Sequence, residues 1–415
     1  MNIVIIGSGA ASKSAIDTIL SADRIDIDIT VITKDTNYFY SRVLLPNYIA
    51  GEINMEDLSF VDKSFIENKR LKIVRGTVIN LDTQLKRVFV DEFGSIEYDN
   101  LIITSGASAI KLKNVKVDLG GIFDLRDFED AVAIKDKVEQ SSNCILIGGG
   151  LVALKAAAAI KKSVKDVTIL VESERVLSRV MDKHSSELVK QLFEENGIKI
   201  VLNAKIDNID ENAGNVSGVK LMDGQYFYAD FVVVGKGVTP NISITCDTDI
   251  RVDKGILVND QMKTSVDSIY AAGDVAQSSS LLSYDSNTFT LWPDAMYQGK
   301  VAAYSILGID REYTGGLSMN SVVFYGVPFI SVGQILDNEI SECEVNIRND
   351  TIKKIYRKVV LKEGHVVGFV FIGDVSYAGM VSWDIKSKIE VKDPIMYLTK
   401  KGLEDLYIIK NNRLT

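Results

Sequence analysis

Cysteine and histidine are scarce in this 415-residue chain, and their placement excludes several kinds of site. Its cysteines, Cys144, Cys246 and Cys343, are scattered and never form a C-x-x-C pair. This excludes a disulfide framework, a four-cysteine iron–sulfur cluster and a structural zinc site. Both histidines, His184 and His365, are expected at the surface, so the sequence offers little support for histidine-based catalysis or metal binding. We therefore expect no metal site.

Positive charge and long apolar runs are also lacking. The formal net charge is −9 and the pI is near 5.1, which argues against general nucleic-acid binding and against anchoring on an anionic membrane. No apolar run approaches the roughly 18 residues of a membrane-spanning helix. The short apolar start, residues 3–6, has no basic segment before it and is expected to be a strand and not a signal peptide. We expect a cytoplasmic protein with neither nucleic-acid nor membrane partners.

Two glycine-rich turns are the main signal that is present. Residues 2–16 read NIVIIGSGAASKSAI, and residues 144–160 read CILIGGGLVALKAAAAI. Each closes an apolar strand and opens an alanine-rich helix, so each combines a tight turn with the unpaired N–H groups of a helix start, as a pyrophosphate requires. Ordinary strand-to-helix corners explain one such turn but not the repetition. The first turn, at Gly7, and the second turn, at Gly148, therefore predict two dinucleotide-binding units.

The pattern of apolar residues predicts the elements around these turns. Residues 1–33 are expected to form strand, helix and strand, and residues 144–172 repeat this order. A hairpin is expected around residues 216–234, with Asp223 and Gly224 at its turn. A helix is expected over residues 294–307, and alternating strands follow residue 313. We expect an α/β fold with two doubly wound, Rossmann-like nucleotide-binding domains and a smaller α+β C-terminal domain.

Together these residues resemble the FAD-dependent pyridine-nucleotide oxidoreductases of the rubredoxin reductase, ferredoxin reductase and nitrite-reductase flavin-domain type. Besides the two turns, the matching segments are residues 40–51, 103–107, 237–241, 255–265, 269–275, 291–299 and 356–376. The last three segments indicate the rubredoxin reductase and nitrite-reductase branch. The resemblance implies the following domains: an FAD domain of residues 1–112 and 243–312, an NAD(H) domain of residues 113–242, and a C-terminal domain of residues 313–415.

The resemblance also implies which residues bind FAD. Its pyrophosphate would be held at the first turn by Gly7, Gly9, Ala10 and Ala11, with Arg42 approaching from the other side. Further FAD contacts are implied for Val78 at the adenine, for Ser105 and Gly106 beside the FAD, and for Gly273 and Asp274 at the ribitol and phosphate. Trp292 would precede a helix whose positive N-terminus points at the flavin and stabilises its reduced form.

For the second nucleotide, the resemblance implies a site around the second turn made by Gly148, Gly150, Leu151, Val152, Glu172 and Gly237. A carboxylate at Glu172 accepts the ribose hydroxyls and repels a 2′-phosphate, which favours NADH over NADPH. The alternative is that Glu172 is only a solvated residue of a polar segment.

The sequence departs from the family at two charged positions. Lys34 stands where the family ends its second strand with the acid that binds the FAD ribose, and the adjacent Asp35 takes this role only if the strand end shifts by one residue. Many relatives pair a lysine and a glutamate near the flavin N5, and here those positions are Pro46 and Lys155. Lys155 either orients the nicotinamide and favours reduced flavin, as a catalytic residue, or it extends into solvent.

The implied activity is hydride transfer from NADH to FAD, followed by electron transfer to a separate carrier of the rubredoxin or ferredoxin type. Disulfide reduction is not expected, because residues 40–51 contain no cysteine. A basic cluster is a candidate docking patch for the carrier, unless its members simply face solvent: Arg348, Lys353, Lys354, Arg357 and Lys358. Two alternatives are a flavin subunit of a larger nitrite-reductase-type complex and a degenerate, non-catalytic nucleotide-binding protein. A homodimer also remains open.

Overall fold

The computed structural model describes residues 1–22, 24–112, 119–283 and 286–411. The chain forms two compact units, each assembled from separate stretches of sequence. Unit 1 comprises Met1–Ile110, Arg126–Val132 and Val238–Leu317, and unit 2 comprises Lys111–Leu125, Ala133–Gly237 and Ser318–Thr415. Because the chain leaves unit 1 and returns to it twice, residues far apart in sequence can line one site.

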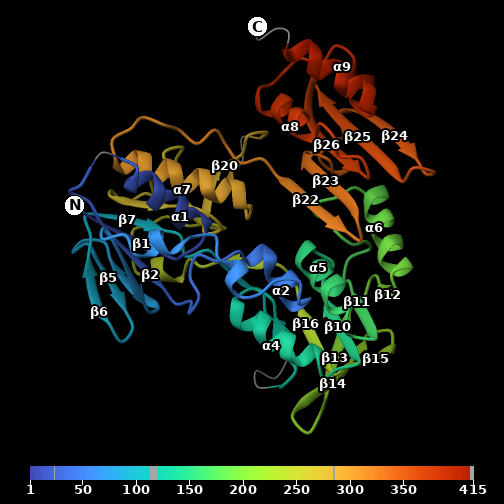
Figure 1. The fold of residues 1–415 in the computed structure, drawn as a ribbon, viewed down its shortest axis with the longest axis horizontal. Helices are drawn as coiled ribbons and strands as arrows, with labels where there is room; N and C mark the ends of the chain where they lie inside the picture. The colour runs from blue at the N-terminus through green and yellow to red at the C-terminus, as the bar shows by residue number, and fades with distance from the viewer. Residues whose placement is uncertain (23, 113–118, 284–285, 412–415) are drawn as a thin grey trace. The chain divides into compact units, whose positions relative to one another are not determined.

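A parallel five-stranded sheet with the order β19-β7-β1-β2-β3 forms the centre of unit 1 (Figure 1). Its strands are β1 (Asn2–Ile6), β2 (Asp28–Thr33), β3 (Leu71–Arg75), β7 (Asn100–Ile103) and β19 (Ile269–Ala271). Alternate residues of β1 face opposite sides of the sheet. Ile3 and Ile5 pack with helices α1 (Ala10–Leu20) and α7 (Trp292–Ile306). Val4 and Ile6 pack with residues of β4 (Val78–Asp82) and β5 (Arg87–Val90). Both faces of the sheet are therefore covered, as parallel sheets require.

Smaller elements complete unit 1. One three-stranded antiparallel sheet consists of β4 (Val78–Asp82), β5 (Arg87–Val90) and β6 (Gly94–Glu97). One antiparallel pair consists of β8 (Ala107–Ala109) and β17 (Val238–Pro240). One mixed sheet consists of β18 (Ile256–Leu257), β20 (Ala276–Ser279) and β21 (Ser286–Asn287). Its short helices are α2 (Leu45–Ile49), α3 (Lys63–Ile66), η1 (Arg42–Leu44), η2 (Glu56–Leu58) and η3 (Ser243–Thr245). Helix α4 (Phe128–Val138) begins in unit 1 and ends in unit 2.

Unit 2 contains a second parallel sheet, with the order β12-β11-β10-β16-β9. Its strands are β9 (Ile122–Asp124), β10 (Asn143–Ile147), β11 (Asp166–Leu170), β12 (Ile198–Val201) and β16 (Phe231–Val234). Helix α5 (Leu151–Ile160) follows β10, and α6 (Lys183–Glu195) precedes β12. The two sheets confirm the expected pair of Rossmann-like folds.

The hairpin expected around residues 216–234 is only partly right. β14 (Asn215–Leu221) and β15 (Tyr226–Tyr228) pair antiparallel around Gly224, and β13 (Ile206–Asn212) joins them. The final four residues instead form β16, which lies parallel to β10 in the main sheet. All four are buried, and such an unbroken apolar run is typical of a strand covered on both faces.

An antiparallel sheet with the order β22-β23-β26-β25-β24 forms the C-terminal part of unit 2. Its strands are β22 (Met319–Phe324), β23 (Val327–Gly333), β24 (Glu344–Asp350), β25 (Ile355–Lys362) and β26 (His365–Ile372). Helical segments α8 (Ala378–Lys386), η4 (Pro394–Leu398) and α9 (Lys400–Asn411) follow. This arrangement confirms the expected α+β C-terminal domain.

A buried polar network within unit 2 joins this sheet to α6. The carboxylate of Asp182 accepts a hydrogen bond from the backbone N–H of Ser185 at 2.8 Å, which caps α6, and another from the Tyr356 hydroxyl at 2.9 Å. It also pairs with Lys358 Nζ at 3.2 Å, and the two side chains are 5% and 4% exposed. Lys358 donates in addition to the carbonyl of Ile335. Every charge in this network therefore has a partner.

Two members of the basic cluster are buried, so for them both the candidate docking patch and the solvent-facing alternative are wrong. Arg357 is 1% exposed, pairs with Asp374 at 3.1 Å and stacks on Phe371. Lys358 is held by Asp182, as described above. Both lie on β25, a strand with neighbours on both sides, so alternation along the strand buries them on opposite faces. Of the cluster, Arg348, Lys353 and Lys354 are exposed.

Within the described ranges, no helix is long and apolar enough to cross a membrane.

Candidate functional site

The first turn joins β1 to α1 in a conformation that requires glycine. Gly7 has φ +105, and a Cβ atom there would lie 2.2 Å from the carbonyl oxygen of Thr104. At Gly9, by contrast, a Cβ would meet nothing within 4 Å. Gly7 therefore lets β1 and β7 approach closely, and Gly9 leaves open space at the start of the helix. Such a cradle fits a phosphate group.

Two helix N-termini border this open space. Helix α1 begins after Gly9 and α7 begins after Leu291, and neither N-cap residue caps its helix with a side chain. The first N–H groups of a helix have no partner within it, so both ends offer backbone donors and a positive dipole, although the first turn of α7 contains a proline, which has no N–H, and one acid. The helices pack closely because residue 299 is glycine: a Cβ there would lie 2.1 Å from the carbonyl oxygen of Ala11.

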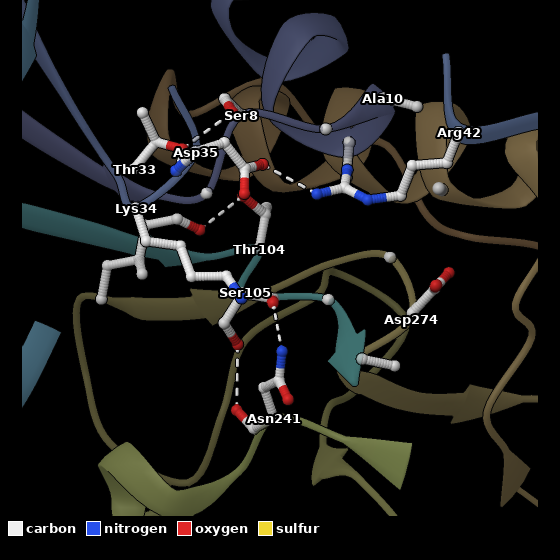
Figure 2. A pocket seen from close by; sticks show the side chains of 18 of the residues that line it. Ser8, Ala10, Thr33, Lys34, Asp35, Arg42, Thr104, Ser105, Asn241 and Asp274 are labelled. Carbon is white, nitrogen blue, oxygen red and sulfur yellow. Dashed lines mark hydrogen bonds and ion pairs between the residues drawn. The ribbon is translucent and has the colours of Figure 1, made fainter. Parts of the chain in front are cut away.

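A buried acid lies at one end of the same pocket. Asp35 is 7% exposed, and one oxygen of its carboxylate accepts a hydrogen bond from Arg42 Nη2 at 2.8 Å (Figure 2). Arg42 also pairs with Asp127 at 3.3 Å, and Lys34 pairs with Asp127 at 3.2 Å. Lys34 follows the end of β2, and its side chain is 56% exposed. The structure therefore places Asp35, not Lys34, as the buried charge beyond β2.

The two carboxylates of this cluster have opposite pKa shifts. Burial raises the pKa of Asp35, and the charge of Arg42 offsets this only in part. Burial also acts to raise the pKa of Asp127, but Arg42 and Lys34 together outweigh it, and the pKa lies below its usual value. Asp127 pairs directly with both cations, whereas Asp35 pairs only with Arg42, and the negative charge of Asp127 raises the pKa of Asp35 further. An additional hydrogen-bond donor, such as a ribose hydroxyl, would therefore stabilise the charged form of Asp35 more than that of Asp127.

A second charged pair lies along the pocket at Asp274. Its carboxylate accepts a hydrogen bond from Arg126 Nη2 at 2.8 Å, and Arg126 Nε donates to the carbonyl of Ala107. The preceding residue, Gly273, has φ +80, and its N–H donates to the side chain of Gln298 at 2.8 Å. Gln298 is fully buried on α7, so this helix fixes the segment that carries Asp274.

Asn241 closes another side of the pocket. Its side-chain amide donates to the carbonyl of Ser105 at 2.8 Å, and the hydroxyl of Ser105 donates to the carbonyl of Asn241 at 3.0 Å (Figure 2). Gly106 follows with φ +68. These two bonds join segments that lie 136 residues apart in the sequence.

The structure brings all the residues expected to bind the first nucleotide into one cavity of about 400 Å³ within unit 1. These lining residues are Gly7, Gly9, Ala10, Ala11, Lys34, Asp35, Arg42, Val78, Ser105, Gly106, Gly273, Asp274 and Trp292. The cavity combines a phosphate cradle, two helix starts and a buried acid, so it fits a dinucleotide. The contact expected of each residue remains a prediction.

Sequence reasoning missed several residues of this pocket. Arg126, Asp127 and Asn241 line it, and Gln298 supports it from behind. The acidic residues Glu129 and Asp130 at the start of α4 are a helix-start signal that could have drawn attention to this segment. Nothing in the local sequence indicated that this helix start belongs to unit 1.

The second turn has the same backbone design as the first. Gly148 has φ +128, and a Cβ there would lie 2.3 Å from the carbonyl oxygen of Gly235. Gly149 lies against the Val171 side chain, whereas a Cβ at Gly150 would meet nothing within 4 Å. Helix α5 begins after Gly150 with no side-chain cap. Unit 2 therefore also offers a cradle and a free helix start.

Charged residues flank the second turn. Glu172 lies beyond β11 with its side chain 66% exposed, and its carboxylate accepts a hydrogen bond from Lys236 Nζ at 2.9 Å. This bond and the charge of Lys236 hold the pKa of Glu172 below its usual value. Gly237 follows with φ +102. The sequence indicated Glu172 and Gly237, but Lys236 was not recognised.

Leu151, Val152 and Lys155 lie on the first turns of α5. Val152 is 49% exposed, and Lys155 is half-buried. Burial lowers the pKa of Lys155. The catalytic role expected of Lys155 stays a prediction.

Comparison with known families covers most of the chain. The family described as pyridine nucleotide-disulphide oxidoreductase matches residues 1–299. The rubredoxin NAD+ reductase C-terminal domain matches residues 319–390. The second match begins at β22, where the antiparallel sheet of unit 2 starts.

Individual relatives agree with these families. The chain is 31% identical to the NADH-rubredoxin oxidoreductase of Clostridium acetobutylicum, over 90% of this chain and 91% of that protein. It is 27% identical to the assimilatory nitrate reductase electron transfer subunit of Bacillus subtilis, over 90% of this chain but 47% of that protein. The chain thus spans about half the length of that relative. The structure of a covalent putidaredoxin reductase–putidaredoxin complex shares the fold, with a TM-score of 0.90 at 21% identity over 98% of both chains.

Proposed function

The chain belongs to the pyridine nucleotide-disulphide oxidoreductase family, and on this premise we propose that it is an FAD-dependent NADH oxidoreductase that delivers electrons to a small iron protein of the rubredoxin type. The observation that carries the proposal is the pocket of unit 1, where every residue expected at an FAD site lines one cavity. The second turn, in unit 2, repeats the same backbone design for NADH.

Bound FAD would supply the redox chemistry, since it accepts a hydride and releases electrons singly. The chain's own residues would bind and orient it. The open space at Gly9 and the first N–H groups of α1 would hold the pyrophosphate, and Asp35 would accept a ribose hydroxyl. The start of α7, at Trp292, would direct its positive end at the isoalloxazine ring.

NADH would bind at the second turn of unit 2. The first N–H groups of α5 would hold its pyrophosphate, and the Glu172 carboxylate would accept the ribose hydroxyls. The same charge repels a 2′-phosphate, so NADH is preferred over NADPH. Lys155 would contact the nicotinamide side of the ligand and favour hydride transfer through its charge.

Two observations support a small iron protein as the acceptor. The C-terminal residues 319–390 match a domain named for rubredoxin NAD+ reductase, and the Clostridium acetobutylicum relative is an NADH-rubredoxin oxidoreductase. Disulfide reduction is not part of the proposal, because residues 40–51 carry no cysteine and Cys144 is buried, which raises its pKa well above the usual value. A buried thiol of raised pKa is a poor nucleophile.

Anaerobic electron transfer tests this function. NADH, the purified protein and oxidised rubredoxin are mixed, and the loss of rubredoxin absorbance is followed, with ferricyanide as a general acceptor and glutathione disulfide as the control for disulfide reduction. We expect rapid reduction of rubredoxin and ferricyanide and none of the disulfide. Reduction of ferricyanide but not of any small iron protein would contradict the proposed acceptor, and NADH-dependent reduction of the disulfide would contradict the proposed reaction class.

A second candidate function is that of a flavin subunit within a larger reductase. It is favoured by the Bacillus subtilis relative, an electron transfer subunit of which this chain spans only 47%. Isolation of the native protein distinguishes the two functions. Elution at the size of a single chain or dimer supports a free reductase, whereas stoichiometric co-purification with a second redox protein supports the subunit.

A further inference from the structure

An ion pair crosses the strand that carries the second turn. Glu172 follows β11 and Lys236 follows β16, and these are the two neighbours of β10 in the sheet. Neighbouring strands lie about 4.8 Å apart, so the two strands are separated by roughly twice that distance. Because Nζ of Lys236 and Oε2 of Glu172 are 2.9 Å apart, their side chains must meet across the carboxyl end of β10, where the second turn begins.

The backbone on each side anchors this pair to the turn. A Cβ at Gly149 would lie 2.6 Å from the side chain of Val171, the residue before Glu172. A Cβ at Gly148 would lie 2.3 Å from the carbonyl oxygen of Gly235 and 3.4 Å from the backbone nitrogen of Lys236. Glu172 and Lys236 therefore follow the two backbone segments that contact the second turn, one on each side of it.

Exposure and charge indicate how this pair responds to a ligand. The side chains of Lys236 and Glu172 are 36% and 66% exposed, and exposed ion pairs contribute little to stability, so partner exchange costs little. A dinucleotide places two phosphates at the turn and a ribose beside the end of β11. An ammonium group suits the phosphates, and a carboxylate suits the ribose hydroxyls. Lys236 and Glu172 thus each have a better partner in the dinucleotide than in one another.

We propose that Lys236 binds the pyrophosphate of the dinucleotide and that it leaves Glu172 when the dinucleotide binds, which frees the carboxylate for the ribose. The inference rests on the proposed function, in that the second turn is taken as the NADH site. NADH and NADPH share the pyrophosphate, so Lys236 strengthens the binding of both, whereas Glu172 distinguishes between them.

The test is calorimetric titration of the holoprotein with ADP-ribose, which carries the pyrophosphate and the ribose but cannot donate a hydride. The variants are Lys236→Met, which removes the charge, and Lys236→Arg, which keeps it. Lys205→Met is the matched control, because Lys205 is exposed and its charge also acts on Glu172, yet it lies beyond β12, away from β10. NADH and NADPH affinities are measured alongside.

We expect Lys236→Met to raise the Kd for ADP-ribose about tenfold and to weaken NADH and NADPH by the same factor. Lys236→Arg should stay near wild type, and Lys205→Met should have little effect. Equal effects of Lys236→Met and Lys205→Met would overturn the inference. The loss of affinity would then reflect only the removal of a positive charge near Glu172 and not a contact between Lys236 and the pyrophosphate. Selective loss of NADPH would also overturn it, since Lys236 would then serve the 2′-phosphate. Absence of ADP-ribose binding in the wild type would contradict the proposed function itself.

Discussion

The two glycine turns share one backbone design in two different chemical settings. Gly7 and Gly148 have φ of +105 and +128, and a Cβ at either would lie 2.2 or 2.3 Å from a carbonyl oxygen of a neighbouring strand's end. Gly9 and Gly150 both precede a helix and both face open space. Glycine is therefore required at the first position by sterics, whereas at the later position the fold itself leaves room for a side chain.

The acids beyond the second strand of each unit differ sharply. The Asp35 side chain is 8% exposed and pairs with Arg42, whereas the Glu172 side chain is 66% exposed and pairs with Lys236. A buried acid suits a cofactor that stays bound, and an exposed acid suits a substrate that enters and leaves in each turnover. The difference agrees with the proposal of a resident FAD in unit 1 and an exchanging NADH in unit 2.

Filling the open space at each turn should have the largest effect, and the function that is lost should differ between the two turns. Gly9→Val should yield protein without flavin, because the side chain occupies the space of the pyrophosphate. Gly150→Val should retain flavin but fail to be reduced by NADH. Visible absorbance and anaerobic addition of NADH check both outcomes. Full flavin occupancy in Gly9→Val would refute the assignment of the first turn.

Breaking the Asp182 network should destabilise unit 2 without emptying the pocket of unit 1. Asp182→Asn keeps a cap for α6 but leaves Lys358 buried without its ion pair, at a cost of about 3 kcal/mol in the free energy of unfolding. Glu195→Gln, which removes the exposed pair with Lys354, is the matched control and should cost less than about 0.5 kcal/mol. Urea unfolding measures both, and equal effects would mean that the buried pair contributes no more than the surface pair.

The same network predicts a pH dependence. Despite burial, which acts to raise it, the pKa of Asp182 lies below its ordinary value of 3.8, because hydrogen bonds and Lys358 favour the carboxylate. A lowered pKa in the folded state contributes stability above pH 3.8, and this contribution is lost as the pH falls through the folded-state value. The stability difference between wild type and Asp182→Asn should therefore shrink in acid.

Substitution of Lys155 should alter the reaction of NADH with FAD but not the binding of FAD. Lys155→Met should lower the flavin midpoint potential and slow flavin reduction by NADH about tenfold. Lys155→Glu should be worse, because a negative charge in the proposed role of Lys155 would disfavour the anionic reduced flavin. Stopped-flow rates and potentials measure the effect. Unchanged values in both variants would show that Lys155 extends into solvent.

Substitution of the exposed acid Glu172 should give the smallest effect on activity. Glu172→Ala removes both the acceptor for the ribose hydroxyls and the repulsion of a 2′-phosphate, so the preference for NADH over NADPH should narrow several-fold. The ratio of kcat/KM for the two donors measures it. A wild type that prefers NADPH would show that the carboxylate is not at the ribose.

Local patterns in the sequence predicted the parts of the fold that depend on local chemistry. The strand, turn and helix around Gly7 and around Gly148 were found because glycine, apolar strands and alanine-rich helices carry recognisable periodicity. The end of β2 was harder to predict. The resemblance put Lys34 at the position of the ribose-binding acid and left Asp35 as the alternative, and the structure buries Asp35, which pairs with Arg42.

Long-range partners could not be predicted from local patterns. Arg126 and Asn241 reach the pocket of unit 1 because the chain returns to that unit twice. Lys358 looked like a surface lysine and is buried, because its partner Asp182 lies far away in the sequence. Lys236 was missed for the same reason, since only the order of β11, β10 and β16 in the sheet brings it to Glu172.

The central claim is that unit 1 holds FAD and unit 2 brings NADH to it. The most direct test is the visible spectrum of the purified protein, recorded before and during an anaerobic titration with NADH. The account predicts a yellow protein with a stoichiometric amount of FAD, whose absorbance bleaches as NADH is added. A colourless protein that gains no flavin on incubation with FAD, or a flavin band that NADH leaves unchanged, would contradict it.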